Sequence, residues 1–121
     1  DNAVSLMPFV IDYKLKLGAF LIDNKQLKAA KVIFETALVL NPTIKEIHLN
    51  LGYIFILQQN FLKADLYLKQ AIALDPDYVL AYENFVLSAQ IQNKMKDVKV
   101  YLNKILEIAP NHNARLILKN L

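Results

Sequence analysis

The prolines of this chain stand at one fixed interval. They occupy positions 8, 42, 76 and 110, so each successive difference in position is 34. The two glycines, Gly18 and Gly52, are separated by the same interval, and each follows a proline at the same distance. A common interval for all prolines and glycines indicates an internal repeat, and a period of this size is typical of proteins built from stacked units.

The apolar residues follow the same period. On a frame whose units begin at Ile11, Lys45 and Val79, the seventh, twentieth and twenty-seventh positions are apolar in all three units. Within each unit, apolar spacings of three and four predict two amphipathic helices joined by a short polar turn. The chain is therefore predicted to be all-α. The expected helices cover residues 11–23, 27–40, 44–57, 61–74, 78–91, 95–108 and 112–120.

The frame also assigns the two ends of the chain. Ala3, Leu6 and Pro8 occupy the places that close a second helix, so residues 1–10 are expected to be the end of a preceding repeat or an N-terminal cap. Because proline cannot continue the hydrogen-bond ladder of a helix, that helix is expected to end near Pro8. We therefore expect the chain to be part of a longer protein. The expected units are 11–44, 45–78 and 79–112, followed by a capping helix at 113–121.

Proline and its polar neighbours predict the joints between units. Pro76 disfavours helical backbone in the residue before it, so one helix is expected to end near Asp75. Polar residues just beyond each proline are expected to cap the next helix by accepting hydrogen bonds from its free N–H groups. The expected capping residues are Asp77, Asn111, and Thr43 in a capping box with Glu46.

Small residues recur where the two helices of one unit must meet. Gly18 and Gly52 carry no side chain, so the first helix of a unit can approach the second closely at that turn. A helix pair alone cannot bury both of its apolar faces, whereas stacking the next pair on it does so. The sequence therefore predicts one continuous stack of helix pairs.

This pattern resembles the tetratricopeptide repeat (TPR), a 34-residue helix–turn–helix with small residues at positions 8, 20 and 27 and proline at position 32. The matching residues are Leu17, Gly18, Ala30, Phe34, Ala37 and Pro42, then Leu51, Gly52, Ala64, Leu68, Ala71 and Pro76. The third unit departs from the pattern, because Val86, Val98 and Ile105 replace small residues. The resemblance implies an α-solenoid of about three helix pairs in a right-handed superhelix, with a C-terminal capping helix.

The residues needed for catalysis or cofactor binding are missing or scattered. The chain has no cysteine, which excludes disulfides and thiol catalysis. Its two histidines, His48 and His112, are far apart in the sequence and have no second ligand at helical spacing, so we expect no metal site and a packing role for His48. Only two glycines are present, too few for a phosphate-binding loop. We expect no enzyme activity, no cofactor and no metal.

Charge and hydropathy limit the partners. The net charge is +3, with thirteen lysines and one arginine spread along the chain, whereas nucleic-acid binders cluster their basic residues. The most apolar run, residues 51–57, is far shorter than the roughly 20 residues that span a bilayer. We expect neither nucleic-acid binding nor direct membrane insertion. A soluble chain without cysteine fits the cytoplasm or the periplasm equally, so the compartment stays open.

The TPR resemblance implies a non-catalytic protein–protein interaction scaffold. In that family the first helices line a concave groove, mainly through positions 2, 5, 6, 9, 12 and 13 of each unit. We expect a peptide or partner segment with aliphatic side chains to bind there, anchored on Tyr53. The predicted partner-binding residues are Leu49, Asn50, Tyr53, Ile56, Leu57, Leu80, Glu83, Asn84, Leu87 and Ile91.

Three alternatives remain open. Exposed apolar ends could make the chain a self-association module. The chain could be the TPR arm of a larger enzyme or membrane protein. The groove could also be closed by the chain's own helix or by further parent sequence.

One class of partner is not expected. TPR modules that grip a C-terminal carboxylate place Lys and Asn at positions 5 and 9 of one unit, Asn at position 6 of the next, and Lys and Arg at positions 2 and 6 of the third. The corresponding residues here are Leu15, Ala19, Asn50, Leu80 and Asn84. Only the second-unit asparagine matches, and the cationic groups that would bind the carboxylate are absent.

Overall fold

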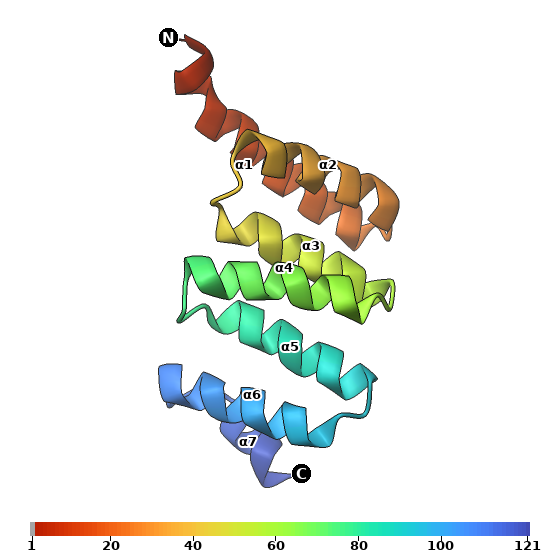
Figure 1. The fold of residues 1–121 in the computed structure, drawn as a ribbon, viewed down its shortest axis with the longest axis vertical. Coiled ribbons are helices and arrows are strands. Elements are labelled where there is room, and N and C mark those ends of the chain that lie inside the picture. The colour runs from red at the N-terminus through yellow and green to blue at the C-terminus, as the bar shows by residue number, and fades with distance from the viewer. Residues whose placement is uncertain (1) are drawn as a thin grey trace.

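The computed structural model describes residues 2–121, with side chains from residue 6 onward, and this part of the chain is all-helical (Figure 1). The predicted fold class is therefore confirmed. The helices are α1 (Asn2–Asp23), α2 (Leu27–Leu40), α3 (Lys45–Leu57), α4 (Phe61–Leu74), α5 (Val79–Ile91), α6 (Met95–Ile108) and α7 (Ala114–Lys119).

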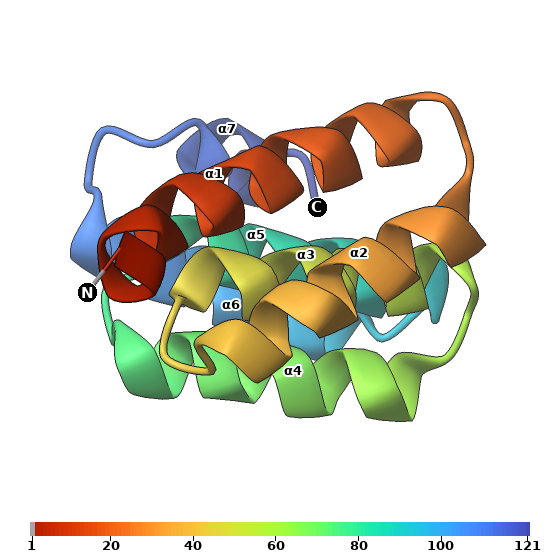
Figure 2. The same cartoon turned by 90° about the horizontal axis from the view of Figure 1, so that it is seen from above.

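Consecutive helices form antiparallel pairs, and the pairs stack into an α-solenoid (Figure 1). The first helices of the pairs form one layer, in which α3 contacts both α1 and α5, and α2, α4 and α6 lie on the other side. Seen from above in Figure 2, α1 and α4 lie on opposite sides of the stack. The C-terminal α7 packs against α6. The molecule therefore has two long faces, one made by first helices and one by second helices.

The core continues from one pair to the next, and part of it lies where the two helices of one pair meet. Phe34 and Leu68, which occupy the same repeat position, are fully buried. A Cβ atom on Gly18 would lie 2.3 Å from the ring of Phe34, and one on Gly52 would lie 2.8 Å from a methyl group of Leu68. Both glycines have ordinary helical backbone. Glycine is therefore needed at these positions for the close contact between the helices, and not for a special backbone conformation.

The turn inside each pair places one residue in the left-handed backbone region. Lys25, Gln59 and Asn93 have φ angles of 62°, 59° and 57°, and they occupy the same position in successive units. This region favours glycine and tolerates asparagine, whereas a long side chain is disfavoured there. The polar turns were predicted, but their strained residue was not, because the chain places no glycine at this position.

The predicted helix end near Pro8 is wrong. Residues 2–10 do not end a separate helix at Pro8, because α1 runs continuously from Asn2 to Asp23 with Pro8 inside it. Pro8 lies near the start of α1, where the lack of its N–H removes one hydrogen bond of the ladder without ending the helix. The first turns of α1 extend beyond the end of α2 (Figure 1).

Two predicted helix caps are also wrong. The residues that precede α3 and α5 are Ile44 and Tyr78, and neither makes a side-chain capping hydrogen bond. Thr43 and Asp77 each lie one residue too early to cap these helices. The turn after proline is one residue longer than the prediction assumed, and this places an apolar residue at the capping position.

The side chains just before the prolines organise these joints instead. Oδ1 of Asp75 accepts a hydrogen bond of 3.1 Å from the backbone N–H of Asp77, and Oδ1 of Asn41 accepts one of 3.0 Å from the N–H of Thr43. A side chain that accepts from the backbone two residues later forms an Asx-turn, which mimics a backbone turn. The sequence Leu74–Tyr78 therefore folds as a turn held by Asp75.

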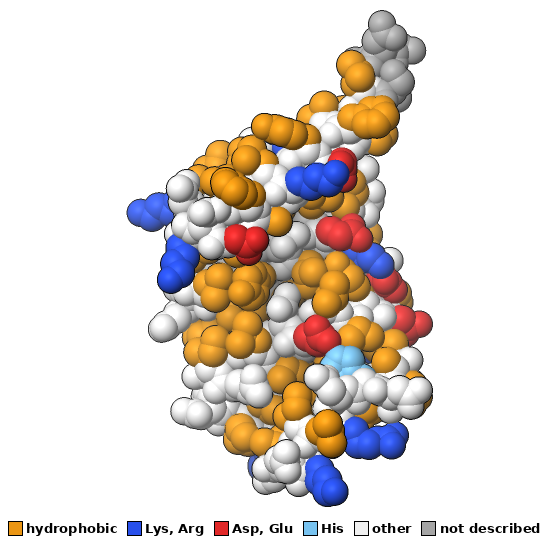
Figure 3. Space-filling view, turned by 180° about the vertical axis from the view of Figure 1, so that it is seen from behind, with side chains coloured by type: hydrophobic (Ala, Val, Ile, Leu, Met, Phe, Trp, Pro, Cys, Tyr) orange, Lys and Arg blue, Asp and Glu red, His pale blue; other side chains and the backbone are white. Residues whose placement is uncertain are grey.

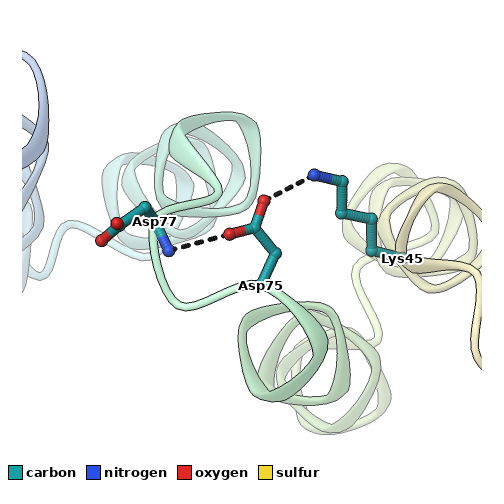
Figure 4. A network of polar contacts seen from close by, with 3 residues as sticks. All are labelled: Lys45, Asp75 and Asp77. Atoms are coloured by element: carbon teal, nitrogen blue, oxygen red, sulfur yellow. Dashed lines mark hydrogen bonds and ion pairs between the residues drawn. The ribbon is translucent and has the colours of Figure 1, made fainter.

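Asp75 also ties this joint to the start of the same unit (Figure 4). Its Oδ2 accepts a hydrogen bond of 2.5 Å from Nζ of Lys45, and this Nζ lies 4.4 Å from the centre of the Tyr78 ring. The hydrogen bond with Lys45 lowers the pKa of Asp75, and the hydrogen bond with Asp75 raises the pKa of Lys45. Burial, with smaller effects of Glu46 and Asp75, raises the pKa of Tyr78 to about 12.

The last helix begins later than predicted. α7 starts at Ala114, and Asn111 does not cap it. Nδ1 of His112 accepts a hydrogen bond of 2.9 Å from the N–H of Ala114, and its Nε2 donates to Oε1 of Glu83 at 2.6 Å. The fully buried Ala114 and the half-buried Leu118 pack against the core between α5 and α6. His112 thus links the start of α7 to α5.

We predict that Gly18→Ala destabilises the protein, although alanine is intrinsically the better helix former by about 0.5–1 kcal/mol. The added methyl group overlaps the buried Phe34 ring, and overpacking of this kind costs about 1–3 kcal/mol. Denaturant unfolding measures the change. A variant more stable than the parent would show that the two helices are not in close contact at this residue.

We predict that Asp75→Ala lowers the melting temperature more than Asp75→Asn at neutral pH. Asparagine keeps the turn acceptor and loses only the charge, whereas alanine loses both. Asp77→Ala is the matched control and should melt close to the parent.

The Asp75→Asn effect should depend on pH with a defined sign. Because folding lowers the pKa of Asp75, the stabilisation is present above the ordinary carboxyl pKa and is lost as pH falls through the folded-state value. The gap between the parent and Asp75→Asn should therefore close in acid. An unchanged gap at low pH would contradict the role of the Lys45 ion pair.

Candidate functional site

The face formed by the first helices carries the predicted groove residues. Figure 3 shows this face, where hydrophobic side chains gather over the middle of the stack with acidic and basic residues around them. An apolar patch with a polar rim is typical of an interaction surface. The arrangement of the individual residues decides which of them a partner could reach.

Two predicted residues line a cleft at one end of this face. The half-buried Tyr53 and the exposed Leu57 of α3 border a cavity of about 460 Å³ with Ile22 and Asp23 at the end of α1. Lys25 completes its charged edge. The cleft combines one aromatic ring, the three aliphatic side chains of Ile22, Leu27 and Leu57, and one charge of each sign, which is a suitable surface for a short peptide segment.

The remaining apolar residues of the predicted set divide into two kinds. Leu49 and Leu87 are half-buried and pack against the cluster around Phe55 and Phe85, so they form the floor between α3 and α5. Leu80 and Ile91 are exposed near the two ends of α5.

The prediction that Ile56 lines the groove is wrong. Ile56 is fully buried and belongs to the core cluster that contains Phe55, Leu68 and Phe85, so no partner can reach it. The reason is the central place of α3, which contacts α1, α2, α4 and α5. Most of its residues are buried, and the accessible stripe is therefore narrower than the family pattern implies.

Two of the three polar residues predicted in the groove already have partners within the chain. Nδ2 of Asn50 donates a hydrogen bond of 2.8 Å to the backbone oxygen of Glu46, one turn earlier in the same helix. Glu83 accepts from His112, as described above. Asn84 is half-buried on α5. A partner that used Asn50 or Glu83 would share these groups with existing hydrogen bonds.

His48 has the packing role that was expected for it. Its side chain is only 7% exposed, and its Nε2 donates to the backbone oxygen of Pro42 at 2.8 Å. Its ring lies 6.1 Å from that of Tyr67. In the described part of the chain, no three His, Cys, Asp or Glu side chains lie close enough together to hold a metal ion. None of the helices within residues 2–121 combines the length and the apolar character needed to cross a membrane.

Comparison with known proteins agrees with this geometry. Residues 45–78, which comprise α3, α4 and the joint after them, match the family model described as Tetratricopeptide repeat. The chain folds as a stack of tetratricopeptide repeats. No curated protein matches the chain. The tetratricopeptide repeat is generally a non-catalytic protein-interaction fold.

Solved TPR structures superpose on almost the whole chain. The first TPR domain of human RPAP3 has a TM-score of 0.83 at 18% identity, and the match covers 93% of this chain and 90% of that domain. YrrB, described as a TPR protein with an unusual peptide-binding site, has a TM-score of 0.80 at 22% identity, with 92% of this chain covered. The match spans only 57% of the YrrB chain.

A third structure contains a bound peptide. It is the first TPR of Spaghetti (RPAP3) with the HSP90 peptide SRMEEVD, and it has a TM-score of 0.80 at 18% identity. The match covers 91% of this chain and 88% of that one. These likenesses establish the fold of the chain.

Proposed function

We propose that this chain is a protein-interaction scaffold that binds a peptide segment on the face made by α1, α3 and α5. The observation that carries this proposal is the cleft between α1 and α3. It has a volume of about 460 Å³ and is lined by Tyr53 and Leu57 of α3 and by Ile22 of α1. The half-buried floor formed by Leu49 and Leu87 continues the apolar surface toward α5.

The proposed partner presents aliphatic side chains from an extended or helical segment. Tyr53 acts as its anchor, because a partly buried aromatic ring in a cleft provides a large contact area at little cost in side-chain entropy. Asp23 and Lys25 at the edge orient charged or polar groups of the segment. The apolar character of the cleft supports this chemistry more than recognition of a charged terminus.

We also propose that the chain does not bind chaperone tails through their terminal carboxylate. A similar structure holds an HSP90 peptide, but Leu15, Ala19 and Leu80 occupy the places where carboxylate-gripping TPR modules carry polar or cationic groups. Without those cations the carboxylate would lose its charge-assisted hydrogen bonds.

We predict that the double variant Tyr53→Ala, Leu87→Ala weakens binding of a peptide selected from a displayed random library. Loss of each apolar anchor should cost about 1 kcal/mol or more. Calorimetry or fluorescence anisotropy measures the affinity, and circular dichroism checks that the variant is folded.

The matched control is Val39→Ala, which truncates an exposed side chain on α2, away from the groove. The peptide SRMEEVD serves as a second probe and should not bind. Unchanged affinity in the folded double variant would place the peptide elsewhere, and tight binding of SRMEEVD that is lost on amidation would refute the exclusion of chaperone tails.

The outer face of α1 favours self-association as a second candidate function. Tyr13 and Phe20 are 65% and 61% exposed, whereas Ile47 and Ile54, which occupy the same repeat positions in the second unit, are fully buried. The second-unit residues are buried because α1 and α2 cover them. The first unit therefore exposes a surface that every inner unit buries.

Further apolar side chains on α1 extend this surface. Leu6, Phe9 and Val10 are also exposed, so the outer face of α1 carries a stripe of large apolar residues along most of its length. Contiguous apolar stripes of this kind mark contact surfaces in soluble proteins. We propose that a second copy of the chain covers the stripe, with the two α1 helices packed against each other.

We predict that Phe9→Lys, Phe20→Lys reduces self-association in sedimentation equilibrium experiments. A parent chain that dimerises should become monomeric at the same concentration, because charges on the stripe oppose burial. Val39→Lys is the control, since it places the same charge on an exposed apolar position of α2. A parent that is monomeric at all concentrations would remove this candidate.

A further inference from the structure

A second cleft lies on the opposite side of the molecule, between α2 and α4. Its volume is about 460 Å³, and it lies within the size range of small-ligand and peptide side-chain sites. Lys31 of α2 and Lys63 of α4 border it, and Phe55, Leu66 and Tyr67 provide its apolar surface. None of these five residues belongs to the groove of first helices.

Both lysines point over one aromatic ring. The Nζ atoms of Lys31 and Lys63 lie 5.7 Å and 5.5 Å from the centre of the Phe55 ring. This ring is almost fully buried and stacks on Tyr67, with 5.6 Å between the ring centres and 12° between their planes. Two ammonium groups thus lie over the same aromatic ring, whose electron-rich face attracts them.

Neither ammonium group has an acidic partner among the described side chains of residues 6–121. The ion pairs found there join Lys16, Lys45, Lys104 and His112 to carboxylates, and they include neither Lys31 nor Lys63. Glu35 borders the same cleft without forming an ion pair with either lysine. The cleft therefore holds two ammonium groups and one carboxylate, an excess of positive charge that favours an acidic ligand.

The next cleft along the stack has the opposite charge. One repeat period after Lys31 and Lys63 stand Asp65 and Asp97, and Ala89 takes the place of Phe55. Asp65 and Asp97 line this smaller cleft between α4 and α6 together with Lys94, so its carboxylates outnumber its ammonium groups. Burial raises the pKa of Tyr101 there, and the charges of Asp65 and Asp97 raise it further. The pair of lysines over an aromatic ring is consequently a feature of one cleft and not of the repeat.

We propose that the cleft between α2 and α4 binds an acidic peptide segment. A carboxylate of the segment lies between the ammonium groups of Lys31 and Lys63 and receives hydrogen bonds from both. The neighbouring aliphatic side chain of the segment packs on Leu66, which is 65% exposed, and on Tyr67. The two aspartates of the next cleft repel the same segment, so it binds at one place along the stack.

The proposal is tested with an acetylated and amidated peptide of alternating leucine and glutamate, added to the ¹⁵N-labelled protein. We expect the amide resonances of Lys31, Phe55, Lys63 and Leu66 to shift in NMR spectra. The corresponding peptide of leucine and glutamine should cause no such shifts, because it lacks the carboxylates. Added salt should weaken the binding of the glutamate peptide.

The variant Lys31→Glu, Lys63→Glu should weaken the glutamate peptide by about tenfold or more, from the loss of two partly exposed ion pairs. Lys99→Glu is the matched control, because Lys99 occupies the repeat position of Lys31 in the third unit. It makes the same charge change outside the cleft and should leave the affinity within about twofold of the parent.

The pair Lys31→Gln, Lys63→Gln removes the charges without reversing them, and it provides the test if the glutamate variant does not fold. Unchanged affinity in either folded double variant would overturn the proposal. Equal binding of the glutamine peptide would overturn it too, as would resonance shifts confined to the cleft around Tyr53 and Leu57. Resonance shifts at the lysine cleft that both double variants abolish would establish the site.

Discussion

The close contact between the two helices of each unit is the constraint on which the rest of the structure depends. Gly18 and Gly52 remove the side chain at the point where Phe34 and Leu68 press against the first helix. This contact gives each pair a buried interior and leaves two outer apolar faces, which only another pair can cover. Stacking therefore follows from the contact, and within the described residues the stripe on α1 is the apolar face that no helix pair covers.

The joints between units set how one pair sits on the next. In the joint after α4, Asp75 holds the turn through its own side chain and binds Lys45 at the start of α3. This links the beginning and the end of one unit, while Tyr78 buries its ring beneath the same ammonium group. The relative position of α3 and α5 determines the floor between Leu49 and Leu87, so the joint contributes to the shape of the groove.

The repeat period was sufficient to predict the helices and the stack, because helix pairing depends on local spacing and on small residues at fixed positions. It did not predict which residue organises each turn. Asp75 and Asp77 are the same residue type on either side of Pro76, and only the folded turn shows that the Asp75 side chain accepts the hydrogen bond. It also placed Ile56 in the groove, because family positions describe an average helix, whereas α3 contacts four other helices. Pro8 occupies the same repeat position as the prolines that follow the second helices, and yet it lies inside α1. A proline at that repeat position is therefore not enough to end a helix.

In a repeat protein the departures from the pattern carry more information about binding than the matches. Residues that recur in every unit serve the contact that all units share, and a partner that used them would find them at each step of the stack. The lysines over Phe55 and the aspartates that replace them one unit later break this equivalence on the face of second helices. Such a difference gives a stack of similar units one preferred binding site for a charged segment. Neither spacing nor composition would single out these residues, because Lys31 and Lys63 come to line one cleft only when α2 and α4 both pack on α3. Alignment of the units shows the change of charge, and the structure shows that the changed residues share a cleft.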